Sequence, residues 1–165
     1  MTARAADPGN GEQSPEAASR PTRIVVDSNV WLRYLIKPSA AIRELIETWW
    51  LDGHVQIVVA SELLSELEAV LARPAMRRFV EATEGQALLE TIRLLADVLP
   101  ALGAIPSFTR DRKDDKFIAC ALVGQAPFVG TADEDLLVVG EVKTVRMITP
   151  YHFVAWLRQG AATAA

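Results

Sequence analysis

The fold is decided by a stretch in which β-forming residues meet a polar triplet, Ile24-Val25-Val26-Asp27-Ser28-Asn29-Val30-Trp31. A short apolar run without alternation is typical of a strand buried on both faces, as in a parallel sheet. The polar triplet then lies at the carboxyl end of that strand, where the ligand sites of open α/β sheets gather. Asp27 or Ser28 could instead cap the next helix by accepting hydrogen bonds from its free amides. This stretch alone leaves both roles open.

Strand-like and helix-like patterns alternate along the rest of the chain. Further short apolar runs lie at residues 55–59, 98–99, 127–130 and 145–148, and apolar residues recur at helical spacing between them. This alternation predicts an α/β fold in which helices cover both faces of a central parallel sheet, giving three layers. We expect Gly124 to end the helix of residues 113–123 in the left-handed conformation.

The length of 165 residues suits one domain with a sizeable core. Residues 1–21 are rich in Ala, Gly, Pro, Ser and Glu without an apolar period, which predicts a disordered tail. We therefore expect a single folded domain over residues 22–158 and a flexible C-terminal tail over residues 159–165.

The charge and the apolar pattern exclude some classes of protein. The formal net charge of −4 does not indicate a nucleic-acid partner, but an acidic metal site would itself add negative charge. No apolar run approaches the roughly 18 residues of a membrane helix, and the N-terminus lacks the apolar core of a secretory signal. The single Cys120 favours a reducing compartment, so we expect a cytoplasmic protein without a membrane partner.

Carboxylates stand at several ends of the predicted strands and helices. Asp27 and Asp133 each follow a strand, Asp114 and Asp115 open a helix, and Glu66 lies within the helix after the second strand. Like charges that gather at one point raise one another's pKa unless a cation is present. Hard oxygen ligands suit Mg²⁺ or Mn²⁺, and the sequence has no Cys or His spacing for zinc.

Several motifs occur together in a recognisable order. They are Val25-Val26-Asp27-Ser28-Asn29-Val30, residues 61–71 with Arg73-Pro74, Asp111-Arg112-Lys113-Asp114-Asp115-Lys116-Phe117-Ile118 through Ala121, Gly130-Thr131-Ala132-Asp133-Glu134-Asp135-Leu136-Leu137, and Ile148-Thr149-Pro150 with Phe153. On these motifs residues 23–158 resemble the PIN domain family, in its branch of toxins from toxin–antitoxin pairs. Arg112 stands where the family often has proline, and Ala132 where glycine is common.

The resemblance implies a PIN-like fold and a metal-dependent endoribonuclease that cleaves single-stranded RNA, acting as the toxin of a type II pair. It implies that Asp27, Glu66, Asp114 and Asp133 are catalytic and bind Mg²⁺ or Mn²⁺. It alone selects Glu66, because periodicity does not distinguish Glu66 from Glu68. The partners would be RNA and a cognate antitoxin, and a homodimer is allowed.

Supporting roles are assigned to other polar residues around these acids. Asn29 and Thr131 are polar groups next to them, and Asp115 and Asp135 either support the site or are simply solvated. Arg110, Arg112, Lys113 and Lys116 form a basic cluster beside Asp114 that either binds the RNA backbone or is solvated.

The helix register separates Asp114 from Asp115. At roughly 100° per residue, Asp114 projects between Phe117 and Ile118, on the face that carries Ala121, and Asp115 is turned away. This predicts that Asp114 points over the strand ends.

Two alternative functions remain. A phosphohydrolase of the haloacid dehalogenase type also has an aspartate after its first strand, but needs a second one where this chain has Asn29. A catalytically silent module that only binds an antitoxin would have no need of all four acids. A nucleophilic Ser28 lacks a partner motif with His or Lys, and no glycine-rich phosphate loop is present.

Overall fold

The computed structural model describes residues 20–164, with side chains to residue 161, so most of the predicted N-terminal tail lies outside it. In this part of the chain six strands form one sheet in the order β3-β2-β1-β4-β6-β5. They are β1 (Thr22–Val26), β2 (Val55–Ala60), β3 (Asp97–Leu99), β4 (Phe128–Gly130), β5 (Glu141–Val142) and β6 (Val145–Ile148). All neighbouring strands are parallel except β5, which pairs antiparallel with β6.

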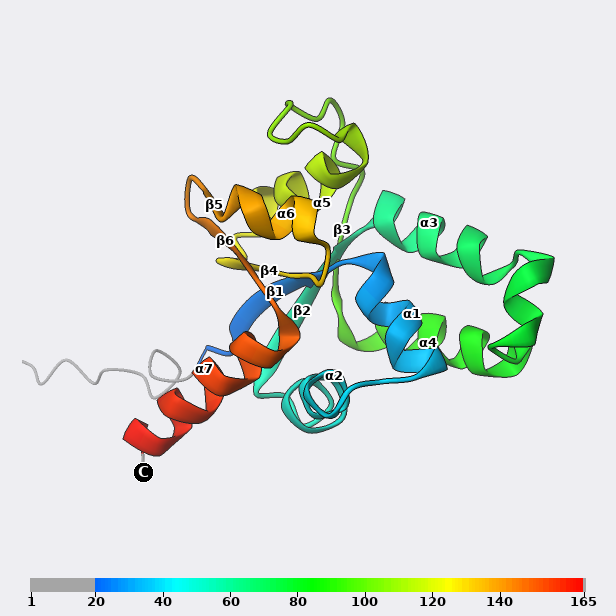
Figure 1. Ribbon diagram of the computed structural model, residues 1–165, viewed down its shortest axis with the longest axis horizontal. Helices are drawn as coiled ribbons and strands as arrows, with labels where there is room; N and C mark the ends of the chain where they lie inside the picture. The colour runs from blue at the N-terminus through cyan, green and yellow to red at the C-terminus, as the bar shows by residue number, and fades with distance from the viewer. Residues whose placement is uncertain (1–19, 165) are drawn as a thin grey trace, which may run out of the picture.

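Helices form the outer layers. They are α1 (Ser28–Ile36), α2 (Ala40–Arg43), the π-helix η2 (Glu44–Trp50), α3 (Ser61–Leu71), the 3-10 helix η3 (Pro74–Arg78), α4 (Ala82–Leu95), α5 (Arg112–Val123), α6 (Glu134–Val139) and α7 (Pro150–Ala164). Helices α5 and α6 lie above the sheet in Figure 1, α2 and α7 lie below it, and α3 and α4 extend to one side. The predicted three-layer α/β fold is confirmed.

The strand register brings the ends of the central strands to one edge. Val26 at the end of β1 lies beside Gly130 at the end of β4, which lies beside Ile148 at the end of β6. Ile24, Val25 and Val129 are completely buried, which explains why these strands are apolar without alternation. The residues that follow β1 and β4 therefore share this carboxyl-end edge.

The helix α2 is capped by Ser39, whose hydroxyl accepts the amide of Ile42. It then continues as a π-helix over η2, which sequence periodicity did not indicate. Trp50 packs into the core edge-on to Trp31, with ring centroids 5.4 Å apart, while Trp49 is half-buried and donates to Glu44. The two adjacent tryptophans therefore do not share one core position.

Gly124 ends α5 for a different reason from the predicted one. Its φ is −81°, and the left-handed residue is Gln125, with φ 54°. A Cβ on Gly124 would lie 2.5 Å from the side chain of Val58. Glycine is needed there because the helix end approaches β2 closely.

The C-terminal helix is longer than expected. The sequence predicted a flexible tail from residue 159, whereas α7 continues to Ala164. That segment contains mostly alanine after Gly160, and alanine has the highest helix propensity, so nothing in it ends the helix.

Two further observations concern membrane-spanning helices and the reactivity of the single cysteine. No helix among residues 20–164 is long and apolar enough to cross a membrane. Cys120 is fully buried in α5, and this burial raises the pKa of its thiol to about 12. A buried thiol with a raised pKa stays protonated near neutral pH, and the protonated form is a weak nucleophile.

Candidate active site

Asp27 is fixed at the carboxyl-end edge by backbone and side-chain hydrogen bonds. Its amide donates to the carbonyl of Gly130 at 3.0 Å. Its Oδ1 accepts the amide of Val30 at 2.9 Å, and its Oδ2 accepts the hydroxyl of Thr131 at 2.5 Å. The capping role is thus confirmed, and it leaves room for a second one, because each carboxylate oxygen can accept more than one bond.

Burial is the main electrostatic influence on Asp27, which is only 3% exposed. Removal from water raises the pKa of this carboxyl, the two hydrogen bonds oppose the rise, and the charge of Asp133 adds to it. The charge of Arg33 on α1 lowers the same pKa. Asp27 therefore lies in a site that contains a second carboxylate, Asp133, and a positively charged side chain, Arg33.

Thr131 connects Asp27 to Asp133. It is completely buried after β4, and its hydroxyl donates to Asp27 while accepting the amide of Asp133 at 3.0 Å. Asp133 in turn accepts the amide of Asp135 at 2.9 Å and so caps α6. A single hydroxyl therefore holds the two acids that follow neighbouring strands.

Asp114 belongs to the same acidic site. Its pKa is raised to about 6, first by burial and then by the charges of Asp133, Asp111, Asp135 and Asp27. The first turn of α5 thus presents this carboxylate to acids that follow β1 and β4, in agreement with the predicted helix register.

Asp115 faces elsewhere, although it is only 2% exposed. Its Oδ1 accepts the amides of Phe108 at 3.0 Å and Thr109 at 2.7 Å. It therefore holds the loop before α5 and is turned away from the other acids.

Glu66 is placed differently from the other three predicted acids. It is exposed on α3 and forms an ion pair with Lys116 of α5. The acids whose charges raise the pKa of Asp114 are Asp133, Asp111, Asp135 and Asp27, and Glu66 does not occur among them. In the described part of the chain, the structure thus brings together Asp27, Asp114 and Asp133, and it engages Glu66 with a predicted RNA-binding lysine.

Arg33 is a candidate that the sequence analysis missed. A hollow of about 470 Å³ is lined by Asn29, Arg33, Ala132, Asp133, Glu134 and Asp135. Arg33 lies four residues after Asn29 in α1, so helical spacing could have placed both on one face. The predicted supporting residues Asn29 and Asp135 also line this hollow, together with Asp133.

The chemistry of the donors fits a hard divalent cation. The clustered side chains offer only carboxylate and hydroxyl oxygens, and a cation would relieve the repulsion that raises the pKa of Asp114. However, no three acidic, His or Cys side chains within residues 20–164 already converge closely enough to hold a metal ion.

A second concave surface lies away from the acids. A groove of about 570 Å³ between α1, η2 and α4 is lined by Tyr34, Leu35, Pro38, Arg43, Ile46, Glu47, Trp50, Leu51, Glu84, Ala87, Leu88 and Thr91. It is more apolar than the acidic hollow and has no cluster of acids, so it is better suited to a side chain of another protein than to chemistry.

Comparison with known proteins supports the fold. A family model described as a PIN domain matches residues 23–135. VapBC2 from Rickettsia felis, bound to a DNA fragment from its promoter, has a TM-score of 0.51 at 12% identity, covering 78% of this chain and 98% of that chain. FitAcB from Neisseria gonorrhoeae has a TM-score of 0.51 at 16% identity, covering 78% of this chain and 99% of the other. At such identities these structures show the fold alone.

No curated protein sequence matches the chain. PIN domains are generally nucleases. The family match thus supports the predicted enzyme class at the level of a nuclease.

Proposed function

Because the chain belongs to the PIN domain family, we propose that it is a metal-dependent endoribonuclease that cleaves single-stranded RNA as the toxin of a type II toxin–antitoxin pair. The observation that carries this proposal is the buried hydroxyl of Thr131, which holds Asp27 and Asp133 together, with Asp114 near enough that their charges raise its pKa. A cluster of buried like charges is costly, and such groups concentrate at catalytic sites. The family match favours this activity over the phosphohydrolase alternative.

The proposed roles follow from the placement of each acid. Asp27, Asp114 and Asp133 would hold Mg²⁺ or Mn²⁺, and Glu66 would join them after leaving Lys116. A bound divalent ion supplies an activated water and stabilises charge on the leaving oxygen. Thr131 keeps Asp27 and Asp133 in position through its two hydrogen bonds.

Arg33 would bind the phosphate of the substrate. A phosphodiester is repelled by the carboxylates, and a guanidinium at the edge of the hollow offers a fork of donors that matches phosphate oxygens. Asn29 on the same side of the hollow would add a neutral donor.

The test is cleavage of single-stranded RNA by the purified chain with Mg²⁺ or Mn²⁺. Activity should be lost with EDTA and with Asp27→Asn, which keeps the shape but removes the anionic ligand. Asp97→Asn is the matched control, because Asp97 lies at the opposite end of the sheet. Equal cleavage by Asp27→Asn and the wild type would refute the metal site. Hydrolysis of small phosphomonoesters without RNA cleavage would favour the phosphohydrolase, and no hydrolysis would favour the silent module.

We also propose a small protein partner of the antitoxin type in the cytoplasm. The toxin-branch motifs and the similarity in fold to VapBC2 and FitAcB support a partner, and the buried thiol of Cys120 suits a reducing compartment. The groove between α1, η2 and α4 is the surface to test. Leu51 lines this groove with an exposed side chain, so Leu51→Arg should abolish co-purification with the product of an adjacent reading frame while RNA cleavage is kept.

A further inference from the structure

Two carboxylates anchor the loop that connects β3 to α5. Near its start, the amide of Leu102 donates to Oε2 of Glu62 at 2.8 Å. Near its end, Oδ1 of Asp115 accepts the amides of Phe108 and Thr109. Both carboxylates belong to helices that flank the carboxyl-end edge, so the loop is tied to this edge at both ends.

The end of the loop is further fixed by short local bonds. The hydroxyl of Thr109 donates to the carbonyl of Asp111 at 2.6 Å, and Oδ1 of Asp111 accepts the amide of Lys113 at 3.0 Å. Arg110 therefore lies between two residues that are each held by hydrogen bonds, and its own side chain is exposed.

The residues between the anchors contribute little to holding the loop. Residues 103–107 are exposed, and a hollow of about 290 Å³ is lined by Ile105, Ser107, Arg112 and Asp115. Leu102 and Phe108 are half-buried against the core at the two anchor points. The path of the chain from Phe108 to Arg112 consequently depends on the bonds to Asp115.

We infer that Asp115 is a positioning residue that fixes the loop segment carrying Arg110 before the first turn of α5, where the guanidinium of Arg110 binds the RNA backbone. This inference rests on the proposed function. Arg110 lies four residues before Asp114 and next to Asp111, whose charge acts on Asp114, so a held loop keeps the charge of Arg110 near the acids. A loop that is already ordered avoids the entropic cost of ordering on binding, which increases affinity without adding a contact.

The experiment compares Asp115→Ala, Asp115→Asn, Arg110→Gln and the double variant Asp115→Ala with Arg110→Gln. We expect Asp115→Ala and Arg110→Gln each to raise KM for RNA about tenfold with kcat within about twofold. Asp115→Asn keeps an oxygen that accepts both amides and should restore most of the affinity. The double variant should be little worse than the poorer single variant, because both changes remove the same interaction.

Hydrogen exchange measures directly whether Asp115 holds the amides of Phe108 and Thr109. Hydrogen exchange of the amides of Phe108 and Thr109 should accelerate in Asp115→Ala and stay slow in Asp115→Asn. Arg110→Gln changes an exposed side chain, so it reports on RNA affinity even if Asp115→Ala fails to fold.

The possible failures are distinguishable. A fall in kcat at constant KM in Asp115→Ala would overturn the inference, because the residue would then act in the chemical step. Unchanged KM in Arg110→Gln, while the wild type still cleaves RNA, would overturn the inference alone. Absence of RNA binding and cleavage by the wild type would overturn the proposed function and the role of the loop with it.

Discussion

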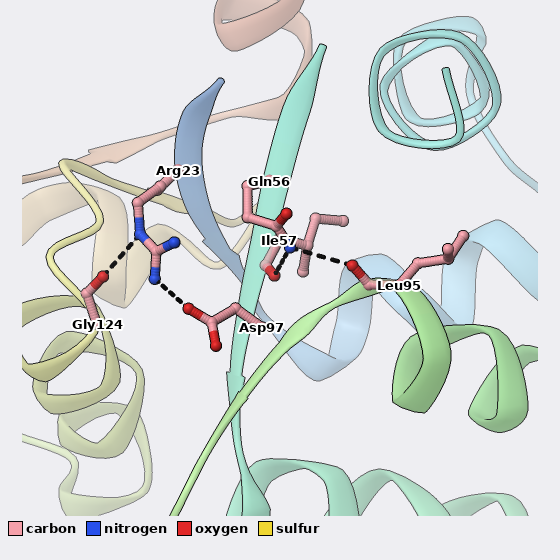
Figure 2. Close-up of polar contacts among 6 residues, drawn as sticks. All are labelled: Arg23, Gln56, Ile57, Leu95, Asp97 and Gly124. Carbon is pink, nitrogen blue, oxygen red and sulfur yellow. Dashed lines mark hydrogen bonds and ion pairs between the residues drawn. The ribbon is translucent and has the colours of Figure 1, made fainter. Parts of the chain in front are cut away.

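The charged side chains at the two ends of the central sheet have opposite kinds of neighbours. At the amino-end edge, shown in Figure 2, Arg23 donates to the carbonyl of Gly124 at 2.8 Å and to the carboxylate of Asp97 at 2.5 Å. The side-chain amide nitrogen Nε2 of Gln56 donates to the carbonyls of Ile57 and Leu95. At the carboxyl-end edge, the like charges of Asp27, Asp114 and Asp133 repel one another. Burial and this repulsion raise the pKa of Asp114 to about 6.

The charged groups at the amino-end edge stabilise the fold, whereas those at the carboxyl-end edge destabilise it. At the amino-end edge each charge has an opposite charge or a backbone carbonyl beside it, and this arrangement links β1 and β3 to the end of α5. At the carboxyl-end edge buried acids face other acids, which lowers stability unless a cation binds. Local conflicts of this kind are expected at functional sites.

The largest expected difference is in catalysis. Asp27→Asn and Asp114→Asn should each lower the rate of RNA cleavage more than about 100-fold, because each removes an anionic ligand. Asp97→Asn at the amino-end edge should leave the rate within about twofold. The measurement is the single-turnover rate with Mg²⁺. A comparable loss in Asp97→Asn would show that the two edges are not functionally distinct.

Arg33→Gln tests whether the positive charge at the carboxyl-end edge contributes to activity. Loss of one charged phosphate contact should lower kcat/KM about tenfold. Arg43→Gln is the control, since Arg43 is an exposed arginine that lines the apolar groove instead. If the two variants were equally active, Arg33 would have no role towards the substrate.

Asp114→Asn should make the fold more stable although it lowers the activity. In EDTA at pH 7, Asp114→Asn should raise the free energy of unfolding by about 1 to 2 kcal/mol, because it removes a buried charge that repels its neighbours. The pKa of Asp114 is about 6 in the folded chain against an ordinary value of 3.8, so the folded state binds the proton more tightly. The advantage of the variant should therefore shrink as the pH falls from 6 towards 4.

Denaturant unfolding of both proteins across this pH range measures the effect. An advantage that grew with falling pH would show that Asp114 is stabilised as the anion, and the contrast between the two edges would then be wrong.

The smallest effect is expected at the amino-end edge. Arg23→Gln should lower the free energy of unfolding by less than about 1 kcal/mol, because the side chains of Arg23 and Asp97 are 32% and 43% exposed. The loss should be smaller still at high salt, which screens exposed ion pairs. Chemical denaturation at two salt concentrations is the measurement, and a loss of several kcal/mol would mean that this edge is a main determinant of stability.

The sequence by itself determined the architecture and most of the candidate acids. Buried parallel strands need continuous apolar runs, and helices need apolar residues at their own period, so the alternation can be read locally. The placement of Asp27 and Asp133 after strands was predictable for the same reason, because parallel strands bring their carboxyl ends to one edge.

Only the tertiary structure decided how the side chains are used. Helix α5 is apolar nearly all round, so periodicity alone could not establish that Asp114 faces the acids and Asp115 the loop. Glu66 and Lys116 are 50 positions apart in the sequence, and Thr131 lies 104 positions from Asp27. Partners at such separations are chosen by how the elements pack together in space, and no local pattern of residues encodes that choice.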